Sequence, residues 1–155
     1  EDLGYMSDTV RQLVRDSGFP GMKVLEFAFD SLGPSDDQPH RYSRDSVCYT
    51  GTHDNCPLGQ WLEEATPERV AFAKQYMGLN GEEGPIWGMI RSGMSSVSDL
   101  FVAQMQDYLE LGAESRMNFP GTLSNKNWTW RAQSDMITSA LAHRIREITR
   151  IFDRL

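Results

Sequence analysis

Cysteine and histidine are scarce in this sequence, acidic residues outnumber basic ones, and no long apolar run is present. The two cysteines, Cys48 and Cys56, cannot form a metal cluster alone. Such sparse use is typical of reduced thiols in a cytoplasmic protein, with a regulatory disulfide as the alternative. A net charge of −7 disfavours a nucleic-acid backbone as partner, because phosphate contacts need a basic surface, so we expect no nucleic-acid partner. The longest apolar runs fall far below the roughly 18 residues that cross a bilayer, so we expect no membrane partner.

The chain of 155 residues is long enough for one domain with a hydrophobic core. It is short for a closed α/β barrel, which typically needs about 250 residues. A composition of 39% hydrophobic and 24% charged residues is ordinary for a globular protein, and the acidity is compatible with a neutral ligand such as a sugar. The sequence begins at Glu1 without an initiator methionine, so we expect its start to be a cut.

Short apolar runs alternate with helical patterns along the chain. We expect strand segments at 1–4 (a stub), 22–29, 47–51 and 100–103. Helices are predicted after Ser7, Thr66 and Gly84, and the clearest helix is C-terminal, where apolar residues within 137–155 step by three or four. This is a parallel α/β order. Three full parallel strands plus a stub, with covering helices, would form the C-terminal half of a (β/α)8 TIM-type barrel, and we expect residues 1–155 to be a single segment of one.

The segment 49–55, with the sequence YTGTHDN, ends a predicted strand with an imidazole and a carboxylate side by side, His53 and Asp54. Polar groups follow the other predicted strands as well, at Glu1-Asp2, Asp30 and Gln106-Asp107. Because ligands bind at the carboxyl ends of parallel strands in α/β folds, we expect the functional site at this edge.

Glu1 and Asp54 are the candidate catalytic carboxylates. Cleavage of a glycosidic bond needs an acid that protonates the leaving oxygen and a carboxylate that stabilises positive charge on the anomeric carbon. Strand ends of one barrel converge on one rim, which can bring two such groups together. The alternative interpretation is that Glu1 is a frayed terminus and Asp54 a loop cap.

His53 and Asp54 admit two other interpretations. A metal site would need further ligands, and no second His or Cys sits at ligand spacing, so we expect no metal and no cofactor. A Ser-His-Asp triad would need a Gly-x-Ser-x-Gly nucleophile elbow, which the sequence lacks. His40 is predicted in a loop and His143 on the helix surface.

Aromatic residues are candidates for stacking on sugar rings, which present C–H groups to an aromatic plane. Four are candidates, of which we expect three to be used in packing: Tyr42, Trp61, Trp128 and Trp130. Phe27 and Phe29 alternate with Glu26 and Ala28, so one of the two is expected to reach the rim.

Six segments together resemble the 4-α-glucanotransferases, the amylomaltases and disproportionating enzymes of glycoside hydrolase family 77. They are EDLG at 1–4, PGMKVLEFAF at 20–29, PHRY at 39–42, YTGTHDN at 49–55, MQDYLELGAESRMNFPGT at 105–122 and NWTWR at 127–131. The resemblance covers essentially the whole chain, in the family's order. It implies retaining transfer of α-1,4-glucan segments between maltooligosaccharides, starch or glycogen-derived dextrins, through a covalent glycosyl-enzyme.

The resemblance also implies roles for individual residues. Glu1, in EDLG, would be the general acid/base. Asp54, in THDN, would be the transition-state stabiliser, and His53 beside it would bond hydroxyls of the donor sugar. Phe27, in FAF, would lie near the donor site, and Asn118 would be a sugar contact.

The sequence departs from the family at three places. The family's nucleophile is an aspartate in an Arg-x-Asp-His motif upstream of EDLG, and this motif is absent from the chain. Glu26 stands where the family usually has Gln, and Cys56-Pro57 replaces an acidic or Thr-rich turn. We therefore expect a chain that is inactive alone and self-associates through its open half-barrel. The alternatives are a non-catalytic glucan-binding or structural fragment, and an unrelated hydrolase with a His-Asp site.

Overall fold

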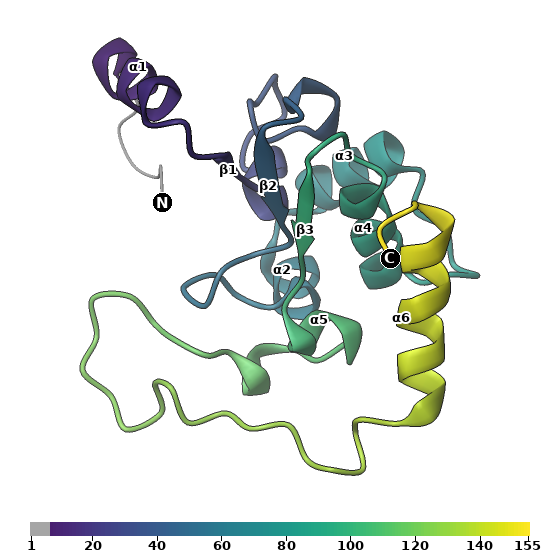
Figure 1. Ribbon diagram of the computed structural model, residues 1–155. Coiled ribbons are helices and arrows are strands. Elements are labelled where there is room, and N and C mark those ends of the chain that lie inside the picture. Colours follow the sequence, from purple (N-terminus) through teal and green to yellow (C-terminus); the bar gives the residue numbers. More distant parts are fainter. Residues whose placement is uncertain (1–6) are drawn as a thin grey trace.

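A three-stranded parallel sheet organises the molecule (Figure 1). The computed structural model describes residues 7–155, so the predicted stub at 1–4, with Glu1, lies outside the described residues. The strands are β1 (Gly21–Val24), β2 (Ser46–Tyr49) and β3 (Leu100–Val102), and β2 lies between the other two. The prediction of three parallel strands with helices is confirmed.

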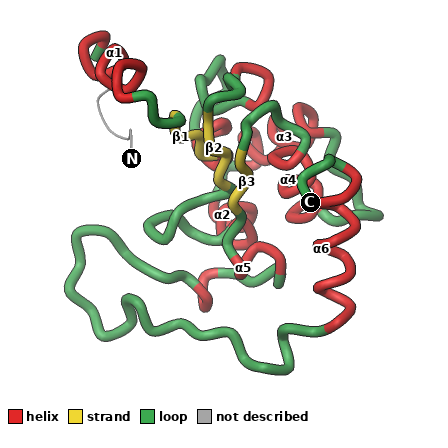
Figure 2. Tube along the Cα trace, viewed as in Figure 1, coloured by secondary structure: helices red, strands yellow, loops and turns green. Residues whose placement is uncertain are grey.

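Helices occupy the connections and the C-terminal part of the chain (Figure 2). The α-helices are α1 (Asp8–Ser17), α2 (Leu58–Glu64), α3 (Pro67–Met77), α4 (Pro85–Met94), α5 (Met105–Tyr108) and α6 (Ser139–Ile151). The 3₁₀ helices are η1 (Leu25–Phe29), η2 (Pro39–Arg41) and η3 (Ala113–Ser115). Within residues 7–155, no helix is long and apolar enough to cross a membrane.

Local capping signals set the helix ends. The Ser7 hydroxyl accepts a hydrogen bond from the Val10 amide at the start of α1, and Gly18 closes that helix with a φ of 68°. Thr66 caps α3 in the same way, with Pro67 at the first helical position. These ends agree with the sequence prediction. The last helix is shorter than predicted: it begins after the Thr138 cap and ends at Ile151.

The run 22–29 is not one strand, as the sequence suggested. β1 ends at Val24, and residues 25–29 turn into η1. The Glu26 amide donates to the Thr50 carbonyl (3.3 Å), which ties the start of this turn to the end of β2. Four of the five η1 residues are buried, so the apolar run reflects burial around a turn rather than an extended strand.

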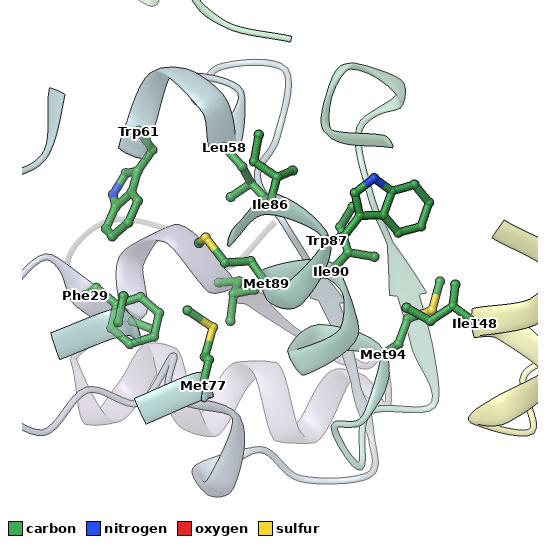
Figure 3. Close-up of a cluster of buried hydrophobic side chains, with 13 residues drawn as sticks. Phe29, Leu58, Trp61, Met77, Ile86, Trp87, Met89, Ile90, Met94 and Ile148 are labelled. Atoms are coloured by element: carbon green, nitrogen blue, oxygen red, sulfur yellow. The ribbon is translucent and has the colours of Figure 1, made fainter. Parts of the chain in front are cut away.

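One face of the sheet is covered by helices and bounds the hydrophobic core (Figure 3). In α4, a Cβ atom at Gly93 would lie 2.4 Å from the Phe101 ring and 3.4 Å from Cys48 Sγ, so the helix packs against β2 and β3 without room for a side chain there. The core side chains are Leu25, Ala28, Phe29, Leu58, Trp61, Ala73, Met77, Ile86, Trp87, Met89, Ile90, Met94 and Ile148.

The opposite face of the sheet is open. The register aligns Val47 with Leu100 and Tyr49 with Val102, so these side chains share one face. Leu100 is 59% exposed and Val102 44% exposed. The predicted strand at 100–103 is therefore buried on one side alone, where Phe101 packs against the core. The apolar face formed by Met22, Val47, Tyr49, Leu100 and Val102 is called the open face below.

The segment 116–138 leaves the body as a long irregular excursion before α6 returns (Figure 2). Two arginines fasten the returning part of the chain. The Arg144 guanidinium lies 3.8 Å from the centre of the Trp87 ring. Arg154 donates three hydrogen bonds to the carbonyls of Met94, Ser96 and Ser98, at 2.8, 2.9 and 2.9 Å.

Candidate active site

Thr50 anchors the polar loop at the carboxyl end of β2 and is fully buried. Its amide donates to the Val102 carbonyl (3.0 Å), and its carbonyl accepts from Glu26. Its hydroxyl donates to Asp107 Oδ2 (2.6 Å) and accepts from the Gln104 amide (3.3 Å). Four hydrogen bonds thus join the ends of all three strands and α5 beneath the loop.

The loop above Thr50 is folded on itself. Asn55 Oδ1 accepts from both the amide and the hydroxyl of Thr52, at 2.9 and 2.8 Å. Gly51 permits this turn, because a Cβ atom there would lie 2.9 Å from Gln104 Nε2 and 3.2 Å from the Asn55 side chain. The turn projects His53 and Asp54 outward, with side chains 54% and 46% exposed.

Three of the predicted site residues lie together. Asn118 Nδ2 donates to Asp54 Oδ1 (2.6 Å), and His53 Nε2 lies 3.4 Å from the same oxygen. Arg116, which was not predicted from the sequence, stabilises this arrangement by bonding the backbone of both Asp54 and Asn118. Its Nη2 donates to the Asp54 carbonyl (2.9 Å), and its Nε donates to the Asn118 carbonyl (3.0 Å).

Trp128, one of the four aromatic residues that the sequence offered for stacking on sugars, lies beside His53. Its ring centroid lies 4.9 Å from that of His53, and the residue is 60% exposed. Of the four aromatic candidates, Tyr42 and Trp61 are buried, Trp130 is half-buried and Trp128 is exposed. Two of the three expected packing residues are therefore buried, and a packing role for the third, Trp130, stays a prediction. In the sequence, Trp128 is marked only by its position within an irregular Asn- and Gly-rich segment.

Phe27 is the half-buried member of its pair. Phe29 is fully buried, with its ring 5.9 Å from Phe72 and 6.1 Å from Trp61. Phe27 is thus the more exposed of the two, and the expectation that one of them reaches the rim stays a prediction. Glu1, the remaining predicted site residue, lies outside the described residues.

Two buried carboxyl groups lie beneath the loop. Burial, with the charge of Asp107 as the next cause, raises the pKa of Glu26 from 4.5 to about 8. Burial also raises the pKa of Asp107 from 3.8 to about 6, against hydrogen bonds from Thr50 and Leu58 that lower it. Cys56 donates to Glu26 Oε1 across 3.6 Å. Glu26 is therefore a neutral acid at pH 7, as an amide at this position would be.

A cavity of about 750 Å³ opens beside the loop. One wall is the polar turn, with Gly51, Thr52, His53 and Asp54. The rest is largely apolar and includes Leu13, Val14, Phe19, Met22, Val47, Tyr49 and Val102. A concave apolar space with a few polar groups at one edge is typical of a small-molecule site. Among residues 7–155, no group of three His, Cys, Asp or Glu side chains could hold a metal ion.

Comparisons with known proteins assign this arrangement to a family. A sequence profile of the 4-alpha-glucanotransferases, glycoside hydrolase family 77, matches residues 1–138. The chain is 43% identical over 155 residues to the 4-alpha-glucanotransferase of Clostridium butyricum, which covers 99% of this chain and 32% of that protein. It is 40% identical over 162 residues to that of Thermus thermophilus, covering 100% of this chain and 32% of that protein.

A solved structure agrees with the sequence comparisons. The amylomaltase from Streptococcus agalactiae in complex with acarbose matches with a TM-score of 0.95 and 37% identity, over 99% of this chain and 31% of that one. The parallel strands and helices described above thus correspond to part of an amylomaltase. The chain spans about a third of the length of these relatives. It belongs to the 4-alpha-glucanotransferase family, glycoside hydrolase family 77.

Proposed function

We propose that the chain forms part of a retaining 4-α-glucanotransferase, which moves α-1,4-glucan segments between maltooligosaccharides or starch chains. In this proposal residues 1–155 are the C-terminal part of a catalytic (β/α)8 barrel. Family membership supports the reaction class, and the acarbose complex of a relative supports an α-glucan as ligand. The barrel is supported by the parallel strand order and by the apolar open face, which a closed barrel would enclose.

The contact among Asn118, Asp54 and His53 carries the proposal. It presents a carboxylate at the carboxyl end of a parallel strand, held by an amide and an imidazole. A carboxylate fixed in this way can stabilise the oxocarbenium-like charge that develops on an anomeric carbon. His53 and Asn118 lie beside this carboxylate and can form hydrogen bonds with sugar hydroxyls.

The remaining roles follow the family resemblance. Glu1 would donate a proton to the leaving oxygen and later activate the acceptor hydroxyl. Phe27 would supply an apolar contact near the donor sugar. A retaining transfer also needs a nucleophilic carboxylate, and the Arg-x-Asp-His motif expected for it does not occur in the 155 residues. In this proposal the chain supplies the transition-state stabiliser and the general acid/base, and residues outside the chain carry out the covalent step.

Two measurements on the 155-residue chain test the proposal. Calorimetry should detect binding of maltoheptaose and no binding of the β-linked cellohexaose. Asn118→Ala should weaken maltoheptaose binding by about tenfold, because the Asp54 carboxylate loses its hydrogen bond. Asn125→Ala is the matched control, since Asn125 is exposed on the same segment.

Turnover distinguishes the transferase part from simple binding. Incubation of the chain with maltotriose should yield neither glucose nor longer maltodextrins, because the nucleophile is lacking. Product formation would contradict the assigned roles. Binding without turnover also fits a non-catalytic glucan-binding segment. That alternative is supported if Glu1→Gln leaves the transfer activity unchanged in a longer chain that includes the nucleophile.

A further inference from the structure

A closed loop, residues 117–128, carries Trp128 to the candidate site. Its two ends are joined by the Trp128 amide, which donates to the Met117 carbonyl (2.7 Å). A second bond runs from the Phe119 amide to Asn127 Oδ1 (3.2 Å). Asn127 Nδ2 also donates to the carbonyl and hydroxyl of Thr122, at 3.2 and 3.1 Å. The neck of the loop is therefore fixed although the loop has no helix or strand.

The backbone at Trp128 has an unusual conformation. Its φ is 64°, in the left-handed region that bulky side chains rarely adopt. Such conformations persist where surrounding bonds impose them, and they cluster at functional sites. Here the bond to Met117 imposes it. The result is a tryptophan that is 60% exposed and directed toward the His53 ring, with 42° between the ring planes.

The loop and the Asp54 turn are tied together. Asn118, at the base of the loop, donates to Asp54 Oδ1, and Arg116 bonds the carbonyls of both Asp54 and Asn118. These contacts hold four groups next to one another: the indole of Trp128, the imidazole of His53, the amide of Asn118 and the carboxylate of Asp54. An apolar plane beside hydrogen-bonding groups is complementary to a pyranose ring, which has a C–H face and a hydroxyl edge.

We propose that Trp128 is a sugar-binding residue, whose indole stacks on the C–H face of a glucose unit while His53 and Asn118 bond its hydroxyls. This inference rests on the proposed function and extends it by one contact. Packing does not explain the residue, because most of its surface is exposed. Its strained backbone is explained by the need to hold the ring beside His53 rather than by the core.

Two substitutions at this position separate the ring from the backbone. Trp128→Phe keeps an aromatic face and the left-handed strain. Trp128→Gly removes the ring and relieves the strain, since glycine adopts positive φ readily. Maltoheptaose titration of the 155-residue chain should give about tenfold weaker binding for Trp128→Gly and binding within about threefold of the unaltered chain for Trp128→Phe. Quenching of tryptophan fluorescence on sugar addition should decrease in both.

Leu123→Ala is the control, because Leu123 is fully exposed on the same loop and should leave binding unchanged. If Trp128→Gly binds as tightly as the unaltered chain, the stacking role is wrong while the proposed function stands. If Trp128→Phe binds as weakly as Trp128→Gly, an aromatic face is not what the position supplies, and the inference is equally overturned. If the unaltered chain does not bind maltoheptaose, the proposed function fails and the stacking role fails with it.

Discussion

Glu26 is a carboxyl group that the fold keeps protonated. The residue is 4% exposed, and the groups whose charges or hydrogen bonds affect its pKa are Asp107, Cys56, Asp30 and Arg116. In the unfolded chain a glutamic acid releases its proton near pH 4.5, whereas the folded protein holds it until about pH 8. Between these values the unfolded state binds fewer protons than the folded state, so the free energy of unfolding falls as pH rises.

Glu26→Gln should remove this pH dependence, because an amide of the same shape does not ionise. At pH 5 the two proteins should be similarly stable. At pH 8 the variant should be more stable by on the order of 3 kcal/mol. Urea denaturation at both pH values measures the difference. Asp107 contributes its own loss of stability between pH 3.8 and about 6 in both proteins, so the comparison depends on the range above pH 6. An equal fall above pH 6 in both proteins would contradict the prediction.

At the scale of elements, the attachment of α6 depends on a few side chains. Its only buried residue is Ile148, while Leu141, Ile145 and Phe152 are partly buried against the core. Arg154 adds three hydrogen bonds, to the carbonyl of Met94 in the last turn of α4 and to those of Ser96 and Ser98 after it. These carbonyls follow the helix end, where few backbone donors remain.

Arg154→Ala should destabilise the protein by about 2 kcal/mol, because hydrogen bonds from a charged donor are lost and carbonyl oxygens lose their partner. Arg146→Ala removes an exposed arginine from α6, just before Arg154 in the chain, and should change stability by less than about 0.5 kcal/mol. Urea denaturation of both variants provides the test. Equal effects would mean that the three bonds do not fasten the chain end.

Sequence reasoning succeeded for elements whose signals are local. The caps at Ser7 and Thr66 require only neighbouring residues, and the structure has both. It failed where distant contacts decide. The turn from β1 into η1 depends on a bond between Glu26 and Thr50, and the exposure of Leu100 depends on what covers the sheet.

The candidate site was predictable in the same partial way. The segment containing His53 and Asp54 stands out in the sequence, and the family resemblance added Asn118. The place of Trp128 depends on a positive φ and on a ring contact with a residue far away in the chain, and neither leaves a local pattern.

At the scale of the whole molecule, the open face should make the isolated chain self-associate. We predict that two copies cover each other's apolar side chains, since unpaired strands and an exposed apolar surface favour association. Sedimentation should show a mass that rises with concentration. Leu100→Lys should weaken the association because it places a charge on the exposed face of β3. Leu123→Lys adds the same charge on the distant loop and should have little effect. A monodisperse monomer that unfolds cooperatively at all concentrations would rule the association out.

The bonds of Thr50 have a consequence for how the site meets a ligand. Because this buried residue holds β1, β3 and α5 at once, the turn that carries His53 and Asp54 is already ordered in the free protein. Binding therefore loses little conformational entropy on that side. The neck of the loop 117–128, which carries Trp128, is likewise held by the bonds from Trp128 to Met117 and from Phe119 to Asn127. Both the polar edge and the aromatic ring of the site are thus preorganised before a ligand binds.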